Sequence, residues 1–79
     1  MRFHLTPHYA RRLEDRSLSD EKCRSIVTYG RKRLLRNGTR GGKVFEFTEK
    51  TESESNRLIV VAEVLKKDCY LMTAYIEGK

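Results

Sequence analysis

The sequence predicts an α+β fold in which two amino-terminal helices pack on a four-stranded antiparallel sheet. Up to residue 29 the apolar side chains recur at helical spacing, whereas from residue 31 they lie in short extended blocks. Turn-forming residues separate these blocks, so we expect the strands to form a meander. Helices followed by a meander are typical of α+β domains with the helices on one side of the sheet. The 79 residues suit a single domain, 1–79.

The first helix is predicted over 7–16. Thr6 is a suitable N-cap because its hydroxyl can accept an amide hydrogen of the first turn, and Pro7 suits the first helical position. Its apolar stripe consists of Tyr9, Ala10 and Leu13. The second helix is predicted over 20–29, between a capping serine and a terminating Gly30. The residues expected to be buried on it are Cys23, Ile26 and Val27.

Four strands are predicted at 34–35, 44–47, 58–65 and 70–76. Residues 2–5 alternate in a way that also suits a short leading strand. Asn-Gly and Gly-Gly within 37–42 supply the turn between the first two strands. We expect a longer hairpin loop at 51–56 and a tight turn at 66–68. The strand 58–65 is apolar almost throughout, which predicts a central position beneath the helices.

Strict alternation along 70–76 predicts two different faces. One face is expected to carry Tyr70, Met72, Ala74 and Ile76, and the other Leu71, Thr73 and Tyr75. A hydroxyl and a phenol on one face can orient a phosphate or transfer a proton, so Thr73 and Tyr75 are candidate site residues. The alternative for Tyr75 is packing, with its hydroxyl at the rim of the core.

The formal net charge of +6 is unevenly distributed along the chain. Residues 1–43 carry 12 Lys and Arg against 4 Asp and Glu, whereas 44–79 carry 5 against 7. A basic half of this kind indicates an anionic partner. The densest cluster contains no acid and consists of Arg31, Lys32, Arg33, Arg36, Arg40 and Lys43.

RNA or DNA is the simplest partner for this cluster. Phosphate contacts supply affinity without sequence readout, so binding is expected to weaken steeply with salt. The alternative is a basic hairpin whose charge only keeps the protein soluble. A membrane surface is disfavoured because no amphipathic helix in this segment offers an apolar face.

His8, Arg12 and Arg16 follow one another at helical i, i+4, i+8 spacing, so they project from one side of the first helix. Two guanidinium groups suit a phosphate and an imidazole suits proton transfer, which predicts an anion site. The alternative is a solvated polar face paired with Glu14 or Asp15.

No cofactor, metal or membrane segment is expected. His4, His8, Cys23 and Cys69 lack the paired short spacings of structural zinc sites. The glycine-rich segment 38–43 is one residue short of a P-loop and lacks its Ser or Thr, so we interpret it as a turn. No apolar run approaches the ~20 residues that cross a bilayer, and no secretory signal is visible. A cytoplasmic location with two reduced thiols is therefore expected.

Several short motifs together resemble the DUF4258 family of small uncharacterised proteins. They are His8-Tyr9-Ala10-Arg11-Arg12, Arg16-Ser17-Leu18-Ser19, Gly30, the strand 58–61 and Met72-Thr73-Ala74-Tyr75. The family's layout is similar to that of BrnT-like and RelE-like toxins, and the wider group includes metal-independent ribonucleases. The resemblance implies a candidate catalytic set of His8, Arg12, Arg16, Thr73 and Tyr75. Those toxins often carry basic residues near the carboxyl end, whereas this chain has Glu77 there.

These features predict a toxin-like, RNA-directed protein whose candidate activity is that of a metal-independent endoribonuclease. The RNA 2′-hydroxyl would attack the adjacent phosphorus while His8 or Tyr75 moves protons and the two helix arginines stabilise the phosphoryl oxygens. Two alternatives stay open. One is a non-catalytic nucleic-acid or ribosome binding module, and the other is a protein-interaction domain whose basic face meets an acidic, antitoxin-like partner.

Overall fold

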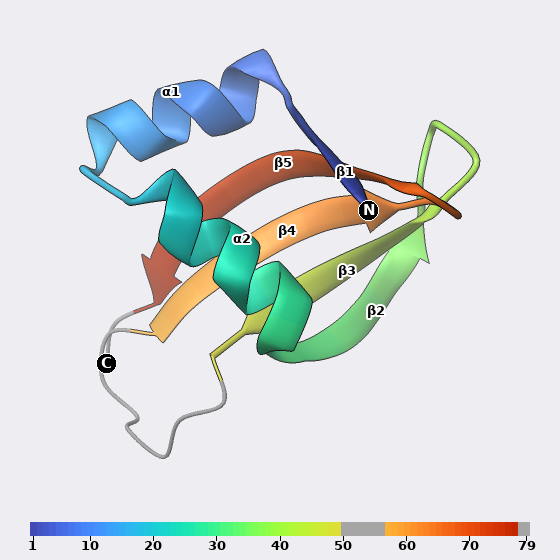
Figure 1. Cartoon of the computed structure of the whole chain (residues 1–79). Coiled ribbons are helices and arrows are strands. Elements are labelled where there is room, and N and C mark those ends of the chain that lie inside the picture. The colour runs from blue at the N-terminus through green and yellow to red at the C-terminus, as the bar shows by residue number, and fades with distance from the viewer. Residues whose placement is uncertain (50–56, 78–79) are drawn as a thin grey trace.

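The computed structural model describes residues 1–49 and 57–77, so the hairpin loop expected at 51–56 lies outside the described residues. Both helices and all four predicted strands are present, and the leading strand forms as well. Along the chain the elements are β1 (Arg2–Leu5), α1 (Pro7–Asp15), α2 (Asp20–Tyr29), β2 (Arg31–Asn37), β3 (Lys43–Thr48), β4 (Arg57–Val64) and β5 (Asp68–Glu77) (Figure 1). Within these residues no helix has the length and apolar character needed to cross a membrane.

The strands form one mixed sheet in the order β1-β5-β4-β3-β2. β2 to β5 are antiparallel neighbours as predicted, but β1 lies parallel to β5, with Arg2 opposite Asp68 and Leu5 opposite Leu71. The prediction of four antiparallel strands is therefore wrong in the number of strands and in the direction of one edge strand. No turn joins β1 to β5, so the sequence carries no local signal for this pairing.

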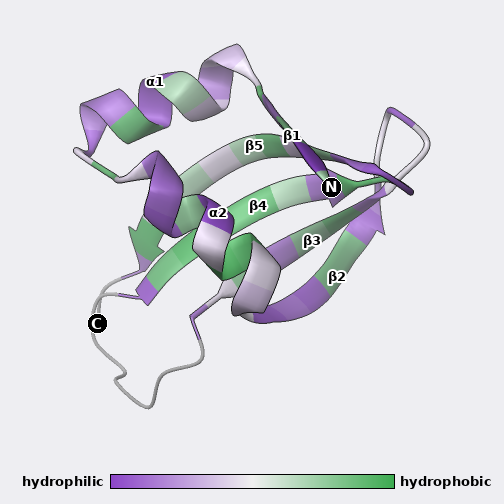
Figure 2. Cartoon of the chain, in the orientation of Figure 1, coloured by the Kyte–Doolittle hydropathy of each residue, from purple (hydrophilic) through white to green (hydrophobic). Residues whose placement is uncertain are grey.

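Both helices cover the same face of the sheet, α1 over β5 and α2 across β4 and β3 (Figure 1). β4 occupies the predicted central position and is strongly apolar along most of its length (Figure 2). The main core beneath the helices consists of Tyr9, Cys23, Ile26, Val27, Phe47, Leu58, Val60, Ala62, Cys69, Leu71 and Ala74. The other side, here called the helix-free face, carries a smaller apolar cluster of Val44, Ile59, Val61, Met72 and Tyr75.

The ends of the helices confirm the predicted caps. Thr6 Oγ1 accepts a hydrogen bond from the amide of Tyr9 at 3.2 Å, and Ser19 Oγ accepts one from the amide of Lys22 at 3.2 Å. Gly30 ends α2 at a close approach to β3, where a Cβ atom would collide with backbone oxygens. The Thr6 and Ser19 side chains thus each accept a hydrogen bond from an amide of the first helical turn that would otherwise have no partner.

The apolar stripe of α1 is narrower than predicted. Tyr9 is buried and Leu13 is half-buried against the main core, but Ala10 is exposed. Successive residues of a helix differ by about 100° in direction. Only the side that carries Tyr9 and Leu13 faces the sheet, and this direction leaves Ala10 in solvent.

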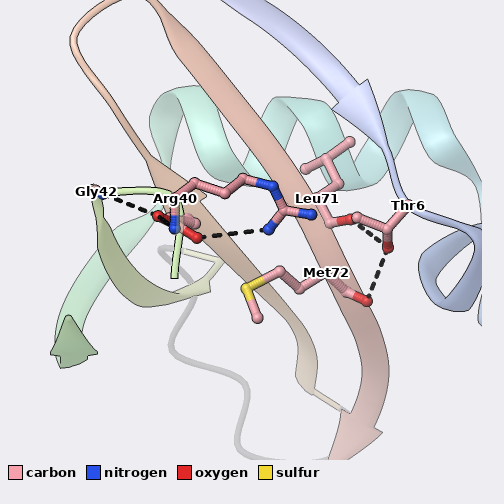
Figure 3. Close-up of polar contacts among 6 residues, drawn as sticks. Thr6, Arg40, Gly42, Leu71 and Met72 are labelled. Carbon is pink, nitrogen blue, oxygen red and sulfur yellow. Dashed lines mark hydrogen bonds and ion pairs between the residues drawn. The ribbon is translucent and has the colours of Figure 1, made fainter. Parts of the chain in front are cut away.

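A bulge interrupts β5 where β1 ends. Two successive residues of β4 lie opposite Leu71 and Thr73, so Met72 is an extra residue. The carbonyl oxygens of Leu71 and Met72 both accept from the Thr6 hydroxyl, at 2.9 and 3.4 Å (Figure 3). Thr6 thus caps α1 and also supplies a hydrogen-bond donor to the two carbonyl oxygens at the bulge of β5.

The bulge changes which residues of β5 share a face. Leu71 and Ala74 lie three residues apart, yet both belong to the main core beneath the helices. The prediction that Ala74 and Ile76 share a face with Tyr70 and Met72 is wrong because the extra residue shifts the alternation, and both lie opposite main-core residues of β4. The residues of β5 that face away from the helices are therefore Tyr70, Met72, Thr73 and Tyr75.

The two cysteines are buried and unpaired in the main core. Burial raises the pKa of both thiols, that of Cys69 to about 11. Since the thiolate is the reactive form, both side chains act here as small apolar core residues.

We predict that Tyr9→Phe lowers the free energy of unfolding by about 1 to 3 kcal/mol. The buried Tyr9 hydroxyl donates to Asp20 Oδ1 at 2.7 Å, and the variant removes this bond to a charged acceptor. Urea unfolding measures the change. The control is Tyr29→Phe, at a side chain that is 74% exposed, and it should change stability by less than about 0.5 kcal/mol. Equal stability of the two variants would contradict a structural role for the Tyr9 bond.

Candidate nucleic-acid interface

β2 presents three arginines on the helix-free face. Residues that lie opposite one another in an antiparallel pair share a face. Arg31, Arg33 and Arg36 lie opposite alternate residues of β3, the last of which is Val44. Val44 belongs to the small apolar cluster of the helix-free face, so the three arginines lie on that face as well. A register shift after Leu34 keeps Arg36 on this side. β2 is the outer strand of the sheet and all seven of its residues are exposed. These cations therefore reach solvent on a face that neither helix covers.

Two of the six predicted cations lie on the other side of the sheet. Lys32 Nζ is 4.9 Å from the centre of the Phe45 ring, which packs against the main core. Lys43 lies opposite Val64, which packs against the same core. The predicted cluster is thus divided by the pleat of the sheet, with four arginines on the helix-free face and two lysines on the helix side.

The fourth arginine of this face, Arg40, comes from the turn between β2 and β3. Its guanidinium carbon lies 4.5 Å from the centre of the Tyr70 ring, and its Nη1 lies 3.5 Å from Glu63 Oε1. Figure 3 shows the side chain extended from the turn across β5. Both contacts hold the cation in a defined place, unlike a freely rotating surface side chain.

Glu63 determines the shape of this turn. Its side chain is fully buried, and Oε2 accepts hydrogen bonds from the amides of Arg40 and Gly42, both at 2.9 Å. Oε1 accepts no hydrogen bond from the described residues, and its charged neighbour is the Arg40 guanidinium. Gly38 lies directly on the carboxylate, where a Cβ atom would collide. A buried carboxylate needs such partners because desolvation penalises its charge.

Tyr70 lies at the centre of a second set of contacts. The His4 ring stacks on it with centroids 4.5 Å apart and planes 16° apart. β5 lies between β1 and β4, with His4 opposite Tyr70 on β1 and Glu63, the partner of Arg40, opposite Tyr70 on β4, so His4 and Arg40 approach Tyr70 from opposite sides. The His4 Nε2–H donates to Asp68 Oδ1 at 2.9 Å, and Arg2 Nε lies 3.1 Å from the same oxygen.

Thr73 and Tyr75 share a face, as predicted, but Leu71, which was expected beside them, lies beneath the helices on the opposite face. Tyr75 is half-buried against the smaller apolar cluster. Burial raises the pKa of its phenol, and the carboxylates of Glu46 and Glu77 raise it further. Glu46 also accepts from Arg33 Nη2 at 3.2 Å. At neutral pH the Tyr75 hydroxyl is therefore a neutral hydrogen-bond donor at the rim of this cluster, next to the arginines of β2.

His8, Arg12 and Arg16 lie on or at the end of α1, which covers the opposite side of the sheet. Arg12 Nε donates to His8 Nε2 at 3.3 Å, so the structure brings these two together. Arg16 is the C-cap residue of the helix and its amide donates to the Arg12 carbonyl. Among the described residues, no hydrogen bond or ion pair joins these three to the strand pair of Thr73 and Tyr75.

Sequence inspection missed four residues of the helix-free face. His4 and Asp68 are 64 positions apart, and no motif links them. Tyr70 was placed correctly on β5 but not among functional residues. Glu63 had a visible signal, since it is the only acid in a strand that is apolar apart from its first residue, Arg57. An acid at such a position predicts a buried carboxylate with dedicated partners.

Comparisons with protein families, characterised proteins and solved structures find no match to this chain. In the part of the chain that the structure describes, no group of three His, Cys, Asp or Glu side chains is arranged to hold a metal ion.

Glu63→Gln is expected to lower the free energy of unfolding by about 1.5 to 3 kcal/mol, the usual contribution of hydrogen bonds to a charged group. The neutral amide weakens the two turn hydrogen bonds and removes the ion pair with Arg40. Urea unfolding measures the loss, with Glu14→Gln at an exposed position of α1 as control. A stability equal to that of the wild type would show that the turn does not depend on this charge.

A pH dependence of stability is expected from Asp68. The hydrogen bond from His4, followed by the charge of Arg2, lowers the pKa of its carboxyl below the ordinary value. The group therefore stabilises the fold above its unfolded pKa of about 3.9, and this contribution disappears as the pH falls through the lower folded value. Urea unfolding of wild type and Asp68→Asn should differ at pH 6 and converge in acid. A difference that stays constant down to pH 2 would contradict this assignment.

Proposed function

We propose that the protein binds RNA through its helix-free face. The observation that carries the proposal is that four arginines lie together on this one face of the sheet, three on the exposed strand β2 and one in the turn that follows it: Arg31, Arg33, Arg36 and Arg40. Sheet surfaces that combine cations with aromatic side chains suit single-stranded RNA, because the cations contact phosphates while the bases lie against the sheet.

The charges of this face are arranged to favour a polyanion. Glu46 is paired with Arg33, and the buried Glu63 with Arg40. Of the described carboxylates, none lies within ion-pair distance of Arg31 or Arg36. Arg31 and Arg33 are two residues apart on β2, so their side chains leave the strand roughly 6.6 Å apart. This separation is comparable to that of successive phosphates in an extended nucleic-acid strand, so β2 can follow a phosphate backbone.

The resemblance to DUF4258 and to BrnT-like and RelE-like toxins supports a toxin-like role for this RNA binding. Two helices followed by an antiparallel meander are the layout that the resemblance implies, with β1 as an addition to it. RNA or the ribosome is therefore the proposed target. An acidic protein that covers the same arginines is the competing partner.

A second candidate function is metal-independent RNA cleavage centred on α1. The contact between Arg12 and His8 favours it, because it places a guanidinium that can bind a phosphate beside an imidazole that can transfer protons. In this mechanism, bound RNA would reach around the edge of β5 from the helix-free face to α1.

We predict that Arg31→Ala with Arg36→Ala weakens binding of a single-stranded RNA oligonucleotide and flattens its salt dependence. The slope of log K against log salt should fall by roughly 1.4, because each lost phosphate contact contributes about 0.7. Fluorescence anisotropy at several salt concentrations measures this slope.

The matched control is Lys32→Ala with Lys43→Ala, which removes the same charge from the helix side of the sheet. Its slope should change much less. Equal slopes for the two double variants would show that only net charge matters and would contradict the assigned face. Absence of RNA binding by the wild type would favour the acidic protein partner.

The cleavage candidate is tested by incubating RNA with wild type and His8→Ala in EDTA. If His8 is the base, the variant binds RNA with unchanged affinity but cleaves it about 10² to 10⁴-fold more slowly. RNA that is bound but stays intact with the wild type would reject cleavage and leave the binding proposal in place.

A further inference from the structure

The His4 ring lies at one end of a stack on the helix-free face. Tyr70 is in the middle, between the imidazole on one side and the Arg40 guanidinium on the other. Both sides of Tyr70 are therefore occupied. Any further planar group that joins this stack has to add at an end, and His4 is the aromatic end.

The outer side of the His4 ring is open. β1 is the outermost strand on its side of the sheet, so within residues 1–49 and 57–77 no strand lies beyond it. The His4 side chain is 40% exposed although one of its sides is covered by Tyr70. The exposed area thus belongs to the ring side that faces away from Tyr70 and to the ring edge.

Two contacts fix the orientation of this ring before any ligand arrives. The bond from Nε2 to Asp68 Oδ1 holds its edge, and the nearly parallel Tyr70 ring holds its plane. A preorganised ring loses little entropy when a base stacks on it. Arg2 lies on the same face as His4. Its side chain contacts Asp68 but is 74% exposed, so its charge is available to the phosphate next to a base stacked on His4.

We propose that the outer side of His4 is a stacking position for an unpaired nucleobase. This inference rests on the proposed RNA binding and specifies the ligand, because duplex RNA keeps its bases inside the helix whereas a single strand can present one to the ring. The RNA strand would run from the arginines of β2 past Arg40 and place a base on His4 at the opposite edge of the sheet.

The probe is a single-stranded oligoadenylate, and the variants are His4→Ala and His4→Phe. Loss of base stacking weakens binding roughly 5- to 100-fold in comparable sites, so His4→Ala should lose affinity by such a factor. His4→Phe keeps a ring but cannot bond to Asp68, and it should bind within about threefold of the wild type. On a ribose-phosphate oligomer without bases, all three proteins should bind equally. A 2-aminopurine in the oligoadenylate should lose fluorescence with wild type and His4→Phe, but less with His4→Ala.

The outcomes separate this inference from the proposed function. If the wild type binds oligoadenylate and His4→Ala binds equally well, the stacking position is rejected while RNA binding stands. If His4→Ala and His4→Phe lose affinity equally, for the oligoadenylate and for the abasic oligomer alike, His4 contributes only through its hydrogen bond to Asp68. The inference is then also wrong. If the wild type binds no RNA, both proposals are overturned. Urea unfolding of each variant confirms that a folded protein is compared.

Discussion

The buried carboxylate of Glu63 is the constraint on which the helix-free face depends. It is the one charged side chain that is fully buried among the described residues, and the turn between β2 and β3 closes over it to supply two amide hydrogen bonds. That closure brings Arg40 onto Tyr70, whose other side carries His4. A continuous series of contacts therefore runs from the central strand to the outer strand β1, and it orders a surface that neither α1 nor α2 covers.

The division of the sheet into two unlike faces follows from the distribution of apolar residues. Both helices cover one face, where most of the buried side chains lie, and this face also receives Lys32 and Lys43 at its edge. The other face has too few apolar residues to bury a helix, and its small cluster is bordered by arginines and tyrosines. The proposed RNA ligand would contact both kinds of side chain on this face, its phosphates the arginines and its bases the aromatic rings.

Local signals in the sequence predicted most of the elements but not the contacts between distant ones. Thr6, Ser19 and Gly30 marked the helix ends because caps act over three or four residues. The bulge at Met72 could not be predicted, since it depends on where β1 leaves the sheet and Thr6 reaches β5. The candidate site was predicted only in part for the same reason. The density of the basic cluster was visible, whereas its division between two faces depends on strand register, and the pairing of β1 with β5 creates the His4 contacts.

The central claim is that RNA lies on the helix-free face, and NMR titration of ¹⁵N-labelled protein with a single-stranded RNA tests it most directly. The account predicts that the largest amide shift changes map to β2, to the turn at 38–42 and to the adjoining parts of β1 and β5. The amides of α1 and α2 should change little, because the sheet separates them from the ligand. Changes concentrated on α1 around His8 and Arg12 would contradict this account and place the RNA on the opposite side of the protein.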